Sequence, residues 1–151
     1  LKSIVIRISQ VYGPSLSGEQ THSVLDKFIK SALKNEIFYV NGYGKDIKDF
    51  VYIDDIVDLI IMVIKSNVED GIFNAGSNIK VALKEVAEKI VAICKSGKFK
   101  LVPFPKEIAD FELGSFYFDI SKTRKTFGWR PKIGLGEGLK RTVEFHKRSG
   151  H

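Results

Sequence analysis

Few residues of this chain have both the type and the position that binding chemistry requires. Lys48 lies just after a Gly-x-Gly turn at 42–44, between two ordered segments, where a cation can face an anionic ligand. Ser9 and Gln10 follow an apolar run, and a helix that begins near Ser23 would add the positive potential of its first amides. Together these residues predict a site that binds an anion.

The side chains that most often carry catalysis are not arranged for it. Asp54 and Asp55 are neighbours, and at the start of a helix neighbouring carboxylates point in different directions, which suits capping better than paired acid and base catalysis. The three histidines lack the spacing of metal ligands, and the single cysteine, Cys94, lies in an apolar helical pattern typical of a buried thiol. We therefore predict no catalytic residue and no metal site.

Composition limits the class of protein. With 151 residues and 44% hydrophobic residues, the chain is large enough to bury a genuine core. The net charge of +6 is interspersed along the sequence, so it favours anionic ligands without requiring nucleic acid. The longest apolar run, from Ile56 to Ile64, is far shorter than the ~20 residues of a membrane span. The single cysteine favours a reducing compartment, and we expect a cytoplasmic protein.

Apolar periodicity predicts an α/β protein. Apolar and β-branched runs indicate strands around five positions: Ile4, Tyr39, Val51, Phe73 and Leu101. We expect these strands to form one small mixed sheet, flanked by four or five helices. One helix should begin after a cap at Thr21 or Ser23, and another should run from Asp55 to about Lys65 with Asp54 or Asp55 as its cap. Because this second helix is apolar on most of its circumference, it should be buried on more than one side.

Five stretches of the chain carry a resemblance to a known family. They are RISQVYGP (7–14), KFIKSAL (27–33), VNGYGKDIKDFVYIDDIVDLI (40–60), IFNAGSN (72–78) and FDISKTRKTFGWRPKIGLGEGLKRTVEF (118–145). In this order they resemble the NAD-dependent nucleotide-sugar epimerases and dehydratases of the extended short-chain dehydrogenase/reductase (SDR) type. The resemblance implies the C-terminal, substrate-binding portion of such an enzyme, as one domain over 1–151 that includes a late strand of the Rossmann sheet at 2–8.

The resemblance also implies what would lie outside this chain. The family's glycine-rich dinucleotide loop and its Tyr-x-x-x-Lys pair belong to a preceding Rossmann domain. Because the chain begins at Leu1 and its only methionine is Met62, we expect it to be part of a longer polypeptide. The intact protein would then be an enzyme that binds NAD or NADP, whereas this chain alone would hold no cofactor and have no activity.

Eight residues acquire roles from the resemblance. The two that would contact the cofactor are Ile8 and Ser9, and the six that would bind the substrate are Gln10, Ser23, Val24, Val40, Asn41 and Lys48. Gln10 stands where the family usually has an asparagine that binds sugar or phosphate. Lys48 stands where an arginine usually clamps the diphosphate, so the positive charge is kept and the bidentate geometry is lost.

One departure from the family concerns the second arginine that usually binds the diphosphate. The corresponding stretch is FELGSFYFD (111–119), which contains no arginine, and Glu112 within it would repel a phosphate. A substrate without a diphosphate is therefore an open alternative.

Three functions remain open from the sequence. The first is the substrate-binding portion of a nucleotide-sugar epimerase or dehydratase, and the second keeps this fold but acts on a substrate without a diphosphate. The third is a non-catalytic module on the same scaffold that uses the +6 charge to bind RNA. For partners we expect a nucleotide sugar, the Rossmann domain and a second copy of the protein, with no membrane and no nucleic acid. We also expect the isolated chain to self-associate.

Overall fold

A computed structural model describes residues 2–14, 23–106 and 114–149 and confirms the α/β class. The helices within these ranges are α1 (Val24–Leu33), η1 (Asn41–Gly44, a 3-10 helix), α2 (Ile53–Ile64), α3 (Leu83–Cys94), α5 (Ser121–Phe127) and α6 (Leu135–Ser149). The strands are β1 (Ile4–Ile8), β2 (Gln10–Tyr12), β3 (Ile37–Val40), β4 (Ile47–Lys48), β5 (Phe50–Tyr52), β6 (Gly71–Ala75), β7 (Val81–Ala82) and β8 (Lys98–Leu101).

The strands do not form the single sheet that was expected. Within the described residues they form separate two-stranded ladders: β1–β6, β2–β5 and β3–β8 are parallel, and β4–β7 is antiparallel. The reason is that the chain changes partner after a few residues. Ser9 N still donates to Ala75 O at 2.9 Å, whereas Gln10 N donates to Asp49 O at 3.1 Å. The chain therefore leaves β6 for β5 between Ser9 and Gln10.

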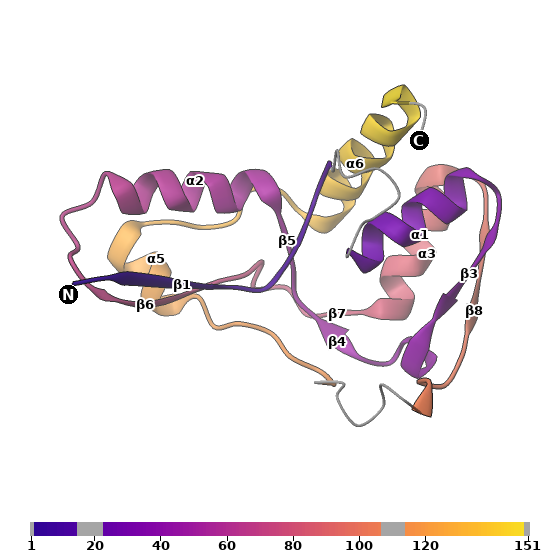
Figure 1. Ribbon diagram of the computed structural model, residues 1–151, viewed down its shortest axis with the longest axis horizontal. Helices are drawn as coiled ribbons and strands as arrows, with labels where there is room; N and C mark the ends of the chain where they lie inside the picture. Colours follow the sequence, from indigo (N-terminus) through magenta and orange to yellow (C-terminus); the bar gives the residue numbers. More distant parts are fainter. Residues whose placement is uncertain (1, 15–22, 107–113, 150–151) are drawn as a thin grey trace.

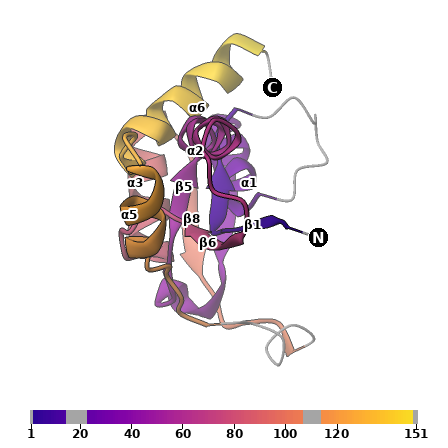
Figure 2. The same cartoon turned by 90° about the vertical axis from the view of Figure 1, so that its left-hand side faces the viewer.

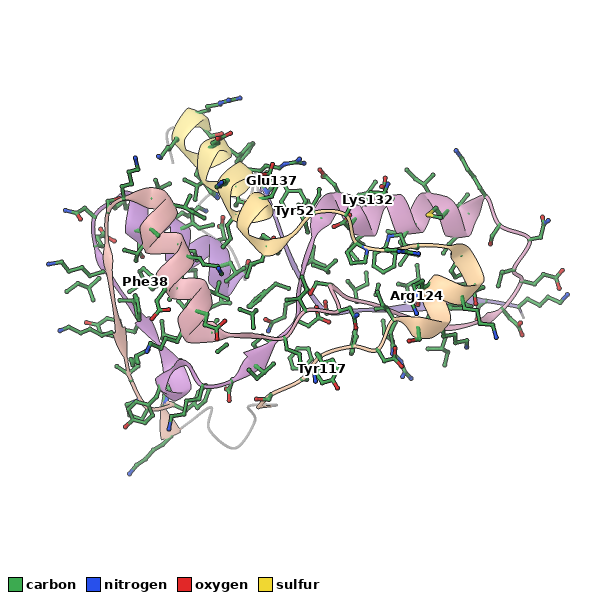
Figure 3. The ribbon with its side chains drawn as sticks, turned by 180° about the vertical axis from the view of Figure 1, so that it is seen from behind. Phe38, Tyr52, Tyr117, Arg124, Lys132 and Glu137 are labelled. Atoms are coloured by element: carbon green, nitrogen blue, oxygen red, sulfur yellow. The ribbon has the colours of Figure 1, made fainter. Side chains whose placement is uncertain are left out.

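Two hydrophobic cores lie on either side of β5. Figure 1 shows α2 on one side of this strand and α1, α3 and α6 on the other. Successive strand residues point to opposite faces, so Phe50 and Tyr52 join the core beneath α1, α3 and α6, while Val51 joins the core beneath α2. In the first core Phe28 and Phe38 stack with ring centroids 4.6 Å apart, and Figure 3 shows Phe38 beside α3. β5 therefore joins the two halves of the molecule.

The two neighbouring aspartates do not cap α2, which corrects the expectation from sequence. β5 runs directly into α2, so the helix begins at Ile53, and Asp54 and Asp55 lie in its first turn. The Asp55 carboxylate instead accepts hydrogen bonds from the backbone N–H groups of Lys132, at 2.8 Å, and Ile133, at 3.1 Å. Lys132 lies beside α2 in Figure 3. Asp55 thus attaches the segment before α6 to the start of α2.

α2 is buried on one side only, contrary to the expectation of burial on several sides. Its buried side includes Ile56 and Leu59, whereas its exposed apolar residues are Val57, Ile60, Ile61, Met62 and Ile64. On the neighbouring ladder the register partners Val5 and Ile72 are both exposed. Partners in register share one face of a ladder, so the described residues leave that face of β1–β6 uncovered (Figure 2).

None of the helices in the described ranges combines the length and the apolar character that a membrane crossing requires.

Candidate functional site

The point where the chain changes strand partners defines the centre of the candidate site. Ser9 and Gln10 stand at the carboxyl end of β1, where the parallel partner changes from β6 to β5. In α/β proteins, ligands bind where neighbouring strands diverge at their carboxyl ends, because the diverging backbone leaves a crevice there. Gln10 is therefore held by backbone hydrogen bonding at a position suited to contact a ligand.

Lys48 belongs to β4, not to a loop as the sequence suggested. Its side chain is nearly buried, and Nζ donates to Gly114 O at 2.8 Å. The same ammonium lies 5.5 Å from the centre of the Phe116 ring and 4.0 Å from Asp46 Oδ2. Backbone, ring and carboxylate together compensate much of the cost of burying this charge. Lys48 is thus a fixed positive charge at the site.

A cavity of about 170 Å³ brings four of the predicted site residues together. They are Gln10 from β2, Val24 from the start of α1, Asn41 from η1 and Lys48 from β4. A second, more open hollow of about 340 Å³ is lined by Ser23 together with Gln10 and Val24. Because Gln10 and Val24 line both spaces, the cavity and the hollow adjoin one another.

The other predicted residues lie beside these spaces without lining them. Val40 is fully buried, so its side chain belongs to the core and only its backbone lies near the cavity. Ile8 is exposed at the end of β1, and the hydroxyl of Ser9 is buried with no hydrogen-bond partner in the described ranges. Thr21 and Glu112 lie outside the described residues.

The sequence missed the cavity's acidic and aromatic residues. Asp46, Tyr39 and Phe104 all line it, and the Asp46 side chain keeps only 21% of its surface exposed. A signal for Asp46 was present, because residues two apart in an extended segment point to the same side, and Lys48 is two positions on. For Phe104 there was none, since it is distant in sequence from every other lining residue.

The Gly-x-Gly turn at 42–44 has the left-handed backbone that its glycines predict, and this turn shapes the cavity. The φ angles of Gly42, Tyr43 and Gly44 are 61°, 56° and 67°. A Cβ atom on Gly42 would overlap the ring of Phe104, so glycine is needed there for close approach as well as for conformation. The turn thereby places Asn41 and the Phe104 ring on the same cavity.

A buried carboxylate next to Lys48 holds three segments in place. Asp49 is 0% exposed, and its Oδ1 accepts hydrogen bonds from Ser77 N at 2.7 Å and from Ser77 Oγ at 2.6 Å. Its Oδ2 accepts from Phe118 N at 3.1 Å. Asp49 therefore attaches the turn after β6 and the segment before α5 to the strand that carries Lys48.

The helix that borders both spaces is also held by buried charged groups. Asp26 on α1 contacts His146 Nε2 on α6, and both side chains are almost completely buried. Lys30 Nζ lies 2.9 Å from the other oxygen of Asp26. These contacts fix α1 against α6, and with it the position of its first residue, Val24.

The described residues can be checked for a metal site and for a reactive thiol. No group of three or more His, Cys, Asp and Glu residues in these ranges is placed to hold a metal ion. Cys94 is buried as predicted, and burial raises the pKa of its thiol, which disfavours the nucleophilic thiolate. The residues that line the cavity are suited to bind an anionic, partly apolar ligand.

Comparison with known proteins gives a consistent set of relatives. Residues 1–76, just over half of the chain, match the sequence model of the NAD dependent epimerase/dehydratase family. A UDP-glucuronate 4-epimerase of Thermodesulfobacterium geofontis is 32% identical over 146 residues, which cover 96% of this chain and 43% of that protein. An uncharacterized protein of Methanocaldococcus jannaschii is 34% identical over 142 residues, covering 93% of this chain and 41% of that protein.

Comparison of the fold with solved structures finds relatives of the same kind. The crystal structure of a UDP-glucose 4-epimerase from Thermotoga maritima with UDP-glucose matches with a TM-score of 0.87 and 27% identity, over 100% of this chain and 48% of that one. The chain thus spans less than half the length of the relatives that it matches. Because residues 1–76 match the family model and these relatives agree with it, the chain belongs to the NAD dependent epimerase/dehydratase family of the extended SDR type.

Proposed function

We propose that this chain is the substrate-binding portion of an NAD-dependent epimerase or dehydratase that acts on a nucleotide sugar. The observation that carries the proposal is the cavity at the carboxyl end of β1, which joins Gln10, Val24, Asn41 and Lys48. Family membership supplies the class of reaction, and the cavity supplies a place for the substrate.

The diphosphate would lie between Lys48 and the start of α1. α1 has ten residues, and its first turn begins at Ser23 and Val24, which both line the second hollow. Helix amides and a nearly buried ammonium both favour an anion, because each presents positive charge in a space with little water. This arrangement favours a diphosphate even though Lys48 stands where the family usually has an arginine.

The cofactor would lie on the other side of β1's carboxyl end. The buried hydroxyl of Ser9 has no partner in the described ranges, which fits a hydrogen bond to a polar group of NAD or NADP. Ile8, exposed beside it, offers an apolar contact. The bound dinucleotide would supply the hydride transfer, while Gln10 contacts the sugar or phosphate from the opposite side.

The uncovered face of β1–β6 and the exposed side of α2 would pack against a Rossmann domain. In this proposal the chain forms one substrate-binding domain, and β1 is a late strand of the Rossmann sheet. The exposed register partners Val5 of β1 and Ile72 of β6 would then be buried between domains. The matched relatives are more than twice as long as this chain, which leaves room for such a domain.

Without that domain, we expect the 151-residue chain to pair with a second copy through the same apolar surface. Analytical ultracentrifugation of the isolated chain should show dimers or larger species as concentration rises. Replacing Ile61 and Ile64 on the exposed side of α2 with lysine should restore monomers, because neither side chain belongs to a core. A concentration-independent monomer of the unmodified chain would contradict this expectation.

Calorimetric titration of the full-length protein with UDP-, dTDP-, GDP- and CDP-glucose tests the substrate proposal. At least one nucleotide sugar should bind with micromolar affinity, and glucose itself should not, because the anion contacts would be lost. If none of the four binds while a sugar monophosphate does, the enzyme acts on a substrate without a diphosphate. If none binds and RNA binds with a steep salt dependence, the chain is a nucleic-acid module.

A further inference from the structure

Two residues that line the cavity each carry a buried oxygen atom with no hydrogen-bond partner in the described ranges. These atoms are Asp46 Oδ2 and Gln10 Oε1, and both are inaccessible to bulk solvent. Lys48 Nζ lies 4.0 Å from Asp46 Oδ2, which is too far for a hydrogen bond. Buried polar atoms in folded proteins are nearly always paired, so each of these oxygens is suited to a group that a ligand brings.

The chemistry of Asp46 restricts what that group can be. A carboxylate only accepts hydrogen bonds, and phosphate oxygens also only accept them. A phosphate beside Asp46 would therefore leave its oxygen unpaired and would add charge repulsion. The Gln10 amide can turn to present its NH₂ group instead, so it adapts to either kind of ligand atom. Asp46 cannot adapt, and it requires an N–H or O–H donor.

The walls around Asp46 fit the nucleoside half of a nucleotide. Phe28, Tyr39 and Phe104 line the same cavity, and aromatic rings pack well on the flat faces of bases. Tyr39 is 58% exposed, which leaves its ring free to cover a ligand at the mouth. A nucleoside has N–H or O–H donors on a flat, largely apolar body, whereas a diphosphate has neither feature.

We propose that Asp46 selects the nucleoside of the substrate by accepting a hydrogen bond from it, either from a base N–H or from a ribose O–H. The proposal rests on the proposed function, because it places one half of the nucleotide sugar within that site. The nucleoside occupies the 170 Å³ cavity, and the diphosphate continues past Gln10 and Val24 into the adjoining hollow. Lys48, which lines the cavity, faces the diphosphate and balances the Asp46 charge.

The test replaces Asp46 with alanine in the full-length protein and measures the binding of UDP and of inorganic pyrophosphate. UDP affinity should fall at least tenfold, because a hydrogen bond to a charged acceptor is lost. Pyrophosphate affinity should stay the same or rise, because a negative charge near Lys48 is removed. Asp46→Asn, which keeps the shape, should give a smaller loss for UDP. The backbone carbonyl of Asp46, which accepts from Leu83 N, is unchanged in both variants.

Nucleotide analogues distinguish the two donors. N3-methyl-UDP lacks the base N–H, and 2′,3′-dideoxy-UDP lacks both ribose hydroxyls. The analogue without the relevant donor should bind the unmodified protein weakly and should lose little more affinity in Asp46→Ala. Asp58→Asn is the matched control, since it removes one negative charge from a carboxylate that pairs with Lys132 on the surface.

Three outcomes decide the question. The proposal is supported if UDP alone is weakened and one analogue is insensitive to the substitution. It is overturned if Asp46→Ala leaves UDP affinity unchanged or raises it, or if both analogues lose as much affinity as UDP. Failure of the unmodified protein to bind any nucleotide would instead overturn the proposed function, and that result needs no variant.

Discussion

Replacing Asp49 with alanine is expected to lower the free energy of unfolding by about 4 kcal/mol. The carboxylate is fully buried and accepts three hydrogen bonds, two from Ser77 and one from the backbone of Phe118. Alanine leaves these donors buried without an acceptor, and it removes the link between three segments. The single tryptophan, Trp129, is 2% exposed, so its fluorescence during urea unfolding reports the change.

Two further variants show whether hydrogen bonding is the cause. Asp49→Asn keeps the volume but turns an NH₂ group toward a donor, so we expect an intermediate loss of stability. Asp58→Ala removes a carboxylate that pairs with the exposed ammonium of Lys132, and it should change stability by less than about 0.5 kcal/mol. Equal effects of Asp49→Ala and Asp58→Ala would show that Asp49 does not hold the segments together.

Replacing Lys48 with methionine is expected to weaken the binding of the preferred nucleotide sugar by about 100-fold. Methionine keeps an unbranched apolar stem of similar length, so a contact between sulfur and the Phe116 ring can replace the cation–π contact while the positive charge is lost. The Asp46 carboxylate would then stand near the diphosphate with no compensating charge. Calorimetry with the sugar nucleotide that binds the unmodified protein measures the loss.

The matched variants for Lys48 separate its charge from its shape. Lys48→Arg restores the charge and should recover most of the affinity if the buried space accepts the guanidinium. Lys132→Met removes a cation that is exposed and distant from the cavity, and the affinity should not change. Unaltered binding by Lys48→Met, with an unaltered circular dichroism spectrum, would exclude Lys48 from substrate binding.

Local periodicity was enough to predict much of the fold. Val24, Phe28 and Ala32 repeat at helical spacing, and α1 begins right after Ser23, one of the two expected caps. The family resemblance, which rested on five ordered stretches, is confirmed by the family match and the relatives. These features depend on residues that are close in sequence or on motifs that remain recognisable as strings of letters.

Features that depend on distant partners could not be predicted in the same way. Asp55 looked like a cap because only its neighbours were visible, whereas its partners are backbone N–H groups at Lys132 and Ile133. The buried role of Asp49 likewise depends on Ser77 and Phe118. The expected burial of α2 failed because a hydrophobic pattern shows which sides avoid water, and does not show what covers them.

The same dependence on distant partners affected the candidate site. Lys48, Gln10 and Asn41 were identified from local motifs and the family resemblance, and the cavity joins them. Phe104 approaches through the space that Gly42 leaves open, a fact of three-dimensional packing. Asp46 could have been found from its spacing to Lys48, but its unpaired oxygen could not.

The pairing of β1 with β6 also has a consequence for how the protein is made. Ile4 pairs with Gly71 and Ile8 with Ala75, so the ladder joins β1 to a strand that follows α2 in the sequence. Such pairings of high contact order fold late, since a long loop must close before any ladder hydrogen bond forms. On the ribosome, the β1–β6 ladder therefore cannot form until Ala75 has left the exit tunnel, while α1 can already form.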